Sequence, residues 1–194
     1  MSELTDETLH PTKNPLASFA FSPLDVSFEN QDGNEQVVLL LRRHWVTNVG
    51  WILAATFFFI IPLFLPSLFS WGGASFYESL ELRWRTVLFM IWYLLLSGFI
   101  FERFINWYFN VYLITNKRII DVDFHGILYK NVTEAQLLRI QDITHRSAGF
   151  LATFFNYGDL LVQTAAEVNE LSFEKVPHPA DVHKILSDLI EDIR

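Results

Sequence analysis

Two long runs without a charged residue constrain this 194-residue chain more than any other feature of its sequence. The first run covers residues 46–69, and the second begins at residue 86 and ends at residue 101. A helix rises about 1.5 Å per residue, so about 20 apolar residues cross a hydrocarbon core about 30 Å thick. The sequence therefore predicts two transmembrane helices, over residues 46–69 and about 86–105. Pro62 and Pro66 lack a backbone donor, so we expect a kink or an early end of the first helix there.

Residues 71–85 connect the two predicted helices and contain a Gly72-Gly73 turn signal, so the helices should form a hairpin. Basic residues gather on the outer flanks of this hairpin: Arg42, Arg43, Arg103, Lys117 and Arg118. The connector holds Arg83 and Arg85 next to two glutamates. Because basic residues stay preferentially in the cytoplasm, both termini are predicted to be cytoplasmic.

All six tryptophans fall between residues 45 and 107. Trp is enriched at membrane–water interfaces, so we expect Trp45 and Trp107 at the inner interface and Trp71 and Trp84 at the outer one. The five basic residues of the flanks are candidate contacts to the membrane surface or to lipid head groups. Basic residues that converge on an anionic leaflet contribute about 1 kcal/mol each.

Composition excludes several classes of function. The net charge is −8, with the excess of acids at both ends of the chain, and nucleic acid needs clustered Lys and Arg instead. The chain has no cysteine, which excludes disulfides, Cys-ligated metals and a thiol nucleophile. We expect no nucleic-acid partner, no metal and no cofactor.

Residues 1–35 are predicted to be a mostly disordered tail, because polar residues and prolines separate its apolar positions. The patch from residue 16 to residue 28 is an exception. Its Phe19, Phe21 and Phe28 could dock on a folded domain or on the bilayer interface, or they could stay in a mobile tail. Residues 36–106 then hold a juxtamembrane segment and the transmembrane hairpin.

After residue 107 the hydrophobic period changes to that of strands. Extended runs at 108–115, 118–124, 127–129, 137–144, 160–164 and 171–176 predict a sheet. On the second run, Asp121 and Asp123 alternate with apolar residues, which predicts one face exposed to solvent. Pro179 and Asp181 favour a helix start, and the apolar positions that follow recur at helical spacing. The fold class is therefore α+β, with a small domain over residues 107–194.

Several short segments occur in the order typical of a known group of bacterial membrane proteins. They are Arg42 to Trp45 before the hairpin, Tyr112 to Ile120, Ile140 to Ile143, Tyr157-Gly158-Asp159, Gln163-Thr164, and Phe173 to Pro177 before the last helix. Together they span roughly residues 35–193. In this ordered set the chain resembles the YdbS-like PH family, bacterial membrane proteins with a pleckstrin-homology-like (PH-like) domain.

This resemblance implies a PH-like fold, which is a bent antiparallel β-sheet or partly open barrel capped by a C-terminal α-helix. It implies a multi-pass location in a prokaryotic plasma (inner) membrane, with the PH-like domain on the cytoplasmic side. It implies no enzymatic chemistry and no established ligand, because such scaffolds mostly bind or assemble. The basic pocket that holds phosphoinositides in eukaryotic PH domains is not evident, since Asp121 and Asp123 closely follow Lys117 and Arg118.

Possible catalytic groups have simpler explanations. Asp121 and Asp123 are explained by a solvent-facing strand, and His178 and His183 are not spaced to share one helical face. We therefore expect a non-enzymatic integral membrane protein whose PH-like domain mediates protein assembly or recognition at the membrane, through a protein partner or self-association. The alternative is a lipid-binding or lipid-sensing module that contacts anionic head groups in the bilayer.

Overall fold

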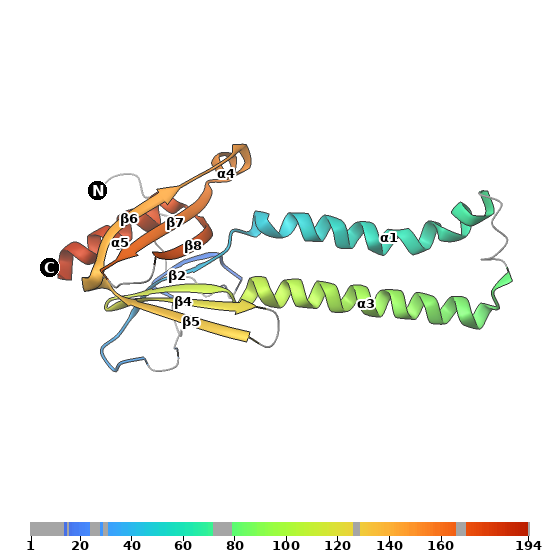
Figure 1. Cartoon of the computed structure of the whole chain (residues 1–194), viewed down its shortest axis with the longest axis horizontal. Coiled ribbons are helices and arrows are strands. Elements are labelled where there is room, and N and C mark those ends of the chain that lie inside the picture. The colour runs from blue at the N-terminus through green and yellow to red at the C-terminus, as the bar shows by residue number, and fades with distance from the viewer. Residues whose placement is uncertain are drawn as a thin grey trace. The chain divides into compact units, whose positions relative to one another are not determined.

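The structure is a computed structural model that describes residues 14, 16–23, 28, 31–71, 79–125, 129–165 and 170–193. Contacts between residues divide the chain into two units. One unit consists of Met1–Thr47 together with Asn106–Arg194, and the other consists of Asn48–Ile105. Figure 1 shows the helices and strands of both units.

The first unit contains two antiparallel sheets (Figure 1). The five-stranded sheet has the order β1 (Phe19–Phe21), β2 (Val37–Arg42), β3 (Val111–Thr115), β4 (Arg118–His125) and β5 (Tyr129–Gln136). The three-stranded sheet has the order β6 (Ile140–Arg146), β7 (Tyr157–Thr164) and β8 (Glu170–Pro177). Among the described residues, this unit also holds η3 (Leu137–Arg139), α4 (Phe150–Phe154), α5 (Pro179–Ile193) and most of η2 (Trp45–Asn48), whose last residue begins the other unit.

The main core lies between the sheets and α5. Alternate residues of β7, Leu160 and Val162, are fully buried, as expected for a strand with one face on a core. The apolar stripe of α5 supplies Val182, Ile185 and Leu186 to the same cluster. This confirms the helix predicted from the apolar spacing after Pro179, and its apolar stripe is the face that packs on the sheets.

The five-stranded sheet begins earlier in the chain than the sequence analysis placed it. Strand β2 pairs with β3 through Leu40 and Leu113, and β1 pairs with β2 through Ala20 and Leu40. The aromatic residues of the N-terminal patch are docked, because Phe19 and Phe21 pack on the main core and Phe28 packs on a second cluster. Strands therefore come from both sides of the apolar hairpin, and not only from residues 107–194.

Other boundaries differ from the sequence predictions by a few residues. The first strand after the apolar helices begins at Val111 and not at residue 108. The run predicted at 137–144 divides into η3 and β6. Residues 127 and 128 of the predicted strand 127–129 lie outside the described residues, and Tyr129 begins β5.

The second unit is built from two long apolar helices, α1 (Val49–Trp71) and α3 (Leu82–Phe109), the second of which ends in the first unit. Both are long and apolar enough to cross a membrane, a criterion of length and composition alone. Pro62 and Pro66 lie inside α1, which continues to Trp71, so the early end considered for this helix is wrong. Each proline removes one backbone donor, and the helix continues past both.

The two helices contact each other through aromatic residues. The indole nitrogen of Trp92 donates to the carbonyl of Phe58 at 3.0 Å, and the Tyr93 hydroxyl donates to the carbonyl of Phe59 at 3.2 Å. Most other large apolar side chains in this unit are exposed, among them Leu53, Phe57, Leu63, Phe64, Met90, Leu94 and Leu95. Such a surface needs a cover other than water.

Candidate recognition surfaces

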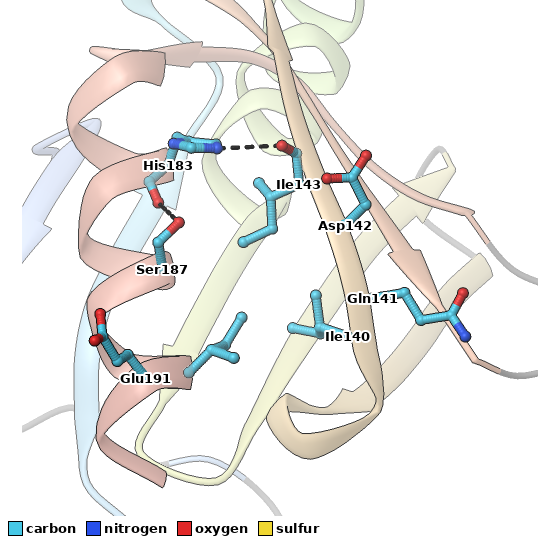
Figure 2. Close-up of a pocket in the computed structure, with 8 residues that line it drawn as sticks. Ile140, Gln141, Asp142, Ile143, His183, Ser187 and Glu191 are labelled. Carbon is cyan, nitrogen blue, oxygen red and sulfur yellow. Dashed lines mark hydrogen bonds between the residues drawn. The ribbon is translucent and has the colours of Figure 1, made fainter. Parts of the chain in front are cut away.

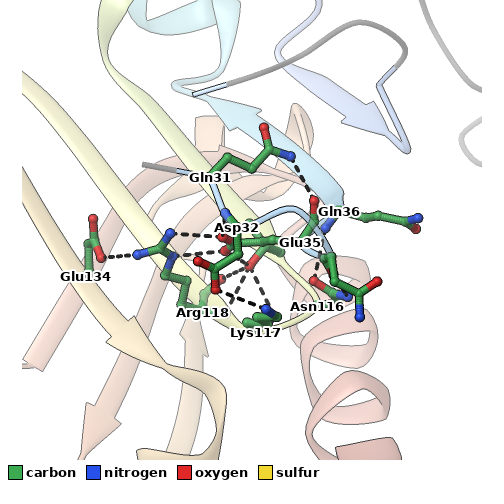
Figure 3. Close-up of polar contacts among 10 residues, drawn as sticks. Gln31, Asp32, Glu35, Gln36, Asn116, Lys117, Arg118 and Glu134 are labelled. Atoms are coloured by element: carbon green, nitrogen blue, oxygen red, sulfur yellow. Dashed lines mark hydrogen bonds and ion pairs between the residues drawn. The ribbon is translucent and has the colours of Figure 1, made fainter. Parts of the chain in front are cut away.

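The turn between β3 and β4 holds Arg118 in a network of acids (Figure 3). Its guanidinium forms two contacts of 2.9 Å with the carboxylate of Glu35 and one of 2.7 Å with Glu134. Glu35 is only 3% exposed and also accepts a hydrogen bond from Thr115. Burial alone would raise the pKa of Glu35, but the hydrogen bonds from Arg118, Thr115 and the backbone of Asp32 outweigh it and lower that pKa. The network joins residues before and after the apolar helices.

The neighbouring base, Lys117, contacts Asp32 at 3.0 Å (Figure 3). Both side chains of this pair are substantially exposed. Lys117 and Arg118 are therefore engaged by acids of the chain itself, which lowers their availability for anionic head groups.

Arg42 and Arg43 lie at the other end of the β2–β3 pair. Arg42 pairs with Val111 at one end of this strand pair, and Val37 pairs with Thr115 at the other. Roughly 17 Å of strand therefore separates Arg42 from the turn that holds Arg118. The Arg42 guanidinium is largely buried, donates to the carbonyls of Tyr108 and Ala17, and lies over the Tyr108 ring. The sequence places Arg42 and Arg118 in one group of candidate lipid contacts, but the sheet does not bring them together.

Arg43 belongs to a partly buried cluster inside the first unit. Its guanidinium contacts Glu174 at 3.0 Å, and the backbone nitrogen of Glu174 donates to the hydroxyl of Tyr112. Asp121 lies close enough for its charge to act on this cluster. Burial raises the pKa of Asp121 to about 6, the nearby Asp123 adds to the rise, and Arg43 opposes it.

The expectation that Asp121 faces solvent is wrong. One of its carboxylate oxygens is buried and has no hydrogen-bond partner among the described residues. Asp121 lies on the same face of β4 as Ile119, which belongs to the main core, while Ile120 belongs to the second cluster on the opposite face. Both faces of this strand are therefore covered, at least in part.

The remaining candidates lie at the ends of the apolar helices. Arg103 contacts its neighbour Glu102 at 3.6 Å, and both side chains are partly exposed. Trp84 is exposed near the start of α3, and the Trp107 indole donates to the carbonyl of Arg43. Trp71 is the last residue of α1, and its side chain lies outside the described part of the chain.

A groove of about 370 Å³ runs between β6 and α5 (Figure 2). Its floor is apolar and includes Ile140 and Ile143, which point toward α5. Two acidic residues, Asp142 and Glu191, are among the residues that line it. His183 of α5 reaches across and donates through Nε2 to the carbonyl of Ile143 at 3.1 Å.

The groove is bordered by a sheet edge. Among the described strands, β6 is an edge strand of its sheet. It pairs with β7 on one side, and no described strand pairs with it on the other. The carbonyl of Ile143 points toward α5, so the backbone groups of Ile143 and, two residues on, His145 face the open side. No local sequence pattern connects His183 with β6, because His183 and Ile143 are 40 positions apart. Its spacing from His178 had only argued against a metal site.

Comparison with protein families decides what kind of domain carries this groove. A family model described as Bacterial PH domain matches residues 38–190, which is most of the chain. The chain belongs to the bacterial PH domain family. The matched range spans both apolar helices as well as β3 to β8. The expected α+β fold with a PH-like domain is confirmed at this level.

Among solved structures, a DUF1696 family protein with a pleckstrin-homology domain from Shewanella loihica PV-4 is similar to this bacterial PH domain. The two chains are 24% identical over 42% of this chain and 68% of that one, with a TM-score of 0.30. A search of curated proteins gives no match.

Proposed function

We propose that this chain is a YdbS-like integral membrane protein whose PH-like domain recognises a protein segment at the cytoplasmic face of a prokaryotic inner membrane. Helices α1 and α3 span the bilayer as a hairpin, and both termini are cytoplasmic. The protein has no enzymatic activity, and its domain binds or assembles.

The exposed surface of the helical unit supports the membrane part of this proposal. Side chains such as Phe57, Leu63 and Leu94 are more than half exposed on helices that are apolar on every side. A helix that is apolar all round is stable when lipid or protein covers it. The hydrogen bonds of Trp92 and Tyr93 to carbonyls of α1 satisfy their polar atoms inside an apolar pair.

The observation that carries the recognition part is the open edge of β6 beside an apolar groove. An extended segment that adds to a sheet edge gains main-chain hydrogen bonds, and pockets beside the edge select its side chains. Here the edge offers the backbone of His145 and the N–H of Ile143, whose carbonyl already accepts from His183, and the groove offers the floor formed by Ile140 and Ile143. Because Asp142 and Glu191 line the groove, the segment that fits best carries a basic residue next to an aliphatic one.

The engagement of the basic residues favours a protein partner over anionic lipid. Each of the five candidates contacts an acid or a backbone carbonyl of the chain: Arg42, Arg43, Arg103, Lys117 and Arg118. A head group would have to displace these partners.

A proline substitution tests strand addition directly. His145→Pro removes a backbone donor on the open side of β6 and leaves the ladder with β7 in place, whereas His145→Ala removes only the imidazole. A photo-crosslinker replaces Ser187, which lines the groove and leaves both acids in place, in the full chain in bacterial membranes. The crosslinked peptide is sequenced by mass spectrometry.

We expect one defined adduct that His145→Ala retains and His145→Pro loses, with a basic residue in the captured segment. A crosslinker at the exposed Ser172 of β8 is the position control and should give no such adduct. An adduct that is insensitive to His145→Pro, or adducts to lipid alone, would overturn the proposal.

A further inference from the structure

The turn between β6 and β7 presents an apolar tip that is separate from the groove. Helix α4 exposes three large apolar side chains to solvent, Phe150 at 81%, Leu151 at 55% and Phe154 at 71%. These positions lie within about one third of the helix circumference, because successive residues are about 100° apart around the axis and residues four apart only about 40°. Ala152, on the opposite side, is buried against the domain. The exposed face is therefore fixed in orientation.

No charged residue occurs between Arg146 and Asp159, so the tip presents neither acids nor bases. The rings of Phe150 and Phe154 are stacked with their centroids 6.0 Å apart, and Phe154 contacts Phe155 edge to face. A neutral aromatic surface fits the apolar part of a membrane interface, and it offers nothing to an anionic head group.

The contact of this tip with Trp45 argues for lipid as its cover. Phe155 lies edge to face against Trp45, with 5.8 Å between ring centroids. Trp45 is itself 54% exposed and begins η2, the short turn that leads directly into α1 at Val49. If α1 spans the bilayer, chain connectivity places Trp45 within about 8 Å of the start of the span, at the depth where Trp residues are enriched.

We propose that α4 inserts its exposed face, Phe150, Leu151 and Phe154, into the interface of the same bilayer that α1 crosses. The PH-like domain then has a lipid contact of its own in addition to its covalent connections to the hairpin. This contact holds the domain against the membrane through apolar side chains and without basic residues. The inference rests on the proposed membrane location, and it is independent of the groove between β6 and α5.

The absence of native cysteine allows a depth measurement with single-cysteine variants of the full chain in liposomes. A polarity-sensitive fluorophore is attached to Phe150→Cys in the tip, to Ile60→Cys near the middle of α1, and to Leu138→Cys in η3. All three parent residues are exposed in the structure. Quenchers on shallow or deep positions of the lipid chain, and aqueous iodide, report the depth of each label.

We expect the emission of the Phe150 label to be blue-shifted. The shallow lipid quencher should quench this label more strongly than the deep one. This matches an interfacial helix, which lies about 5–10 Å into the boundary between head groups and acyl chains. The Ile60 label should be quenched most by the deep quencher, and the Leu138 label by iodide. Adding Phe154→Asp to the labelled Phe150→Cys chain should remove the lipid quenching, whereas Phe154→Leu should preserve it.

The possible failures are distinguishable. A deep Ile60 label with an iodide-quenched Phe150 label overturns tip insertion and leaves the membrane span intact. A Phe150 label shielded from iodide and from both lipid quenchers also overturns it, because protein then covers the tip. An Ile60 label quenched by iodide overturns the membrane location itself, and with it the inference.

Discussion

The ion pair of Glu35 and Arg118 illustrates how a single residue connects distant parts of the chain. Glu35 precedes the apolar helices and Arg118 follows them, and the carboxylate of Glu35 is fully buried. Removing one partner of a buried pair leaves an unpaired charge, which typically costs about 3–5 kcal/mol. Arg118 is partly exposed, so we place the cost of Arg118→Met at about 3 kcal/mol. Thermal and chemical unfolding of the detergent-solubilised chain measure this loss.

The adjacent lysine provides the matched control. Lys117→Met breaks a pair with Asp32 that is exposed on both sides, so its cost should be at most about 1 kcal/mol. Combining Arg118→Met with Glu35→Gln removes both charges and should recover part of the lost stability. Equal effects of the two single substitutions would show that the Arg118 pair is no more important than a surface contact.

Asp121 should reduce the stability of the folded domain at neutral pH. Its pKa is raised to about 6 in the folded state, from 3.8. The folded state therefore binds more protons than the unfolded state between these values, and this carboxyl lowers stability as pH rises through that window. Asp121→Asn removes the effect. Allowing for partial exposure, the variant should be about 1 kcal/mol more stable at pH 7.5 and nearly unchanged at pH 4.

The measurement is the difference in unfolding free energy between the variant and the parent chain across this pH range. Other groups cancel in this difference, including Glu35, whose lowered pKa produces the opposite trend. A difference that does not grow between pH 4 and pH 6 would contradict the assigned environment of Asp121.

Sequence reasoning failed at Asp121 for a physical reason. Alternation of acidic and apolar residues normally indicates one wet face, but β4 has an apolar cluster on each side. The pairing of Arg118 with Glu35 was equally hidden, since no local pattern connects residues 83 positions apart. Basic residues could be found from sequence, whereas their partners could not.

At the scale of elements, the periodic segments were predictable and the doubly buried strand was not. Helix α5 shows a regular apolar stripe, and both long helices show uninterrupted apolar runs. Strand β2 is a short continuous apolar run because Leu39 and Leu41 face the main core and Leu40 faces the second cluster. Such a run before a hydrophobic helix was interpreted as a juxtamembrane segment, since periodicity alone cannot identify it as a strand.

The close approach of β6 and β7 at Gly158 leads to a prediction about these strands. A Cβ at Gly158 would lie 2.6 Å from the carbonyl oxygen of Arg146 and 2.7 Å from the hydroxyl of Ser147. The first of these is backbone, which cannot rotate away. Gly158→Ala should therefore destabilise the chain by about 1–3 kcal/mol, the usual cost of forcing extra atoms into a packed site.

Gly33→Ala is the control, because a Cβ there meets nothing within 4 Å. Scanning fluorimetry should show a lower unfolding temperature for Gly158→Ala and almost no change for Gly33→Ala. A Gly158→Ala chain as stable as the parent would mean that the two strands separate easily at this point. The groove on the other side of β6 would then rest on a less rigid edge.

At the scale of the whole molecule, the order of elements explains how a pair of long apolar helices and a sheet occupy one chain. The sheet begins with β1 and β2, the chain then forms α1 and α3, and β3 returns to pair with β2. The two helices are thus an insertion between the paired strands β2 and β3. The unit that contains the sheet is therefore connected to the helices twice, once before α1 and once after α3. The apolar runs and the strands that follow them were visible in the sequence, whereas β1, β2 and the pairing across the insertion required the structure.

Membrane topology gives the prediction that tests this arrangement as a whole. The flanks hold five basic residues against two in the connector, so the connector should be outside and the PH-like domain in the cytoplasm. In the cysteine-free chain, Glu81→Cys lies within the connector and Ser172→Cys lies on an exposed position of β8. A membrane-impermeant maleimide should label Glu81→Cys in intact bacterial spheroplasts and Ser172→Cys only after permeabilisation. The reverse pattern would place the domain outside the cell, and equal labelling of both sites before permeabilisation would contradict a crossing of the membrane.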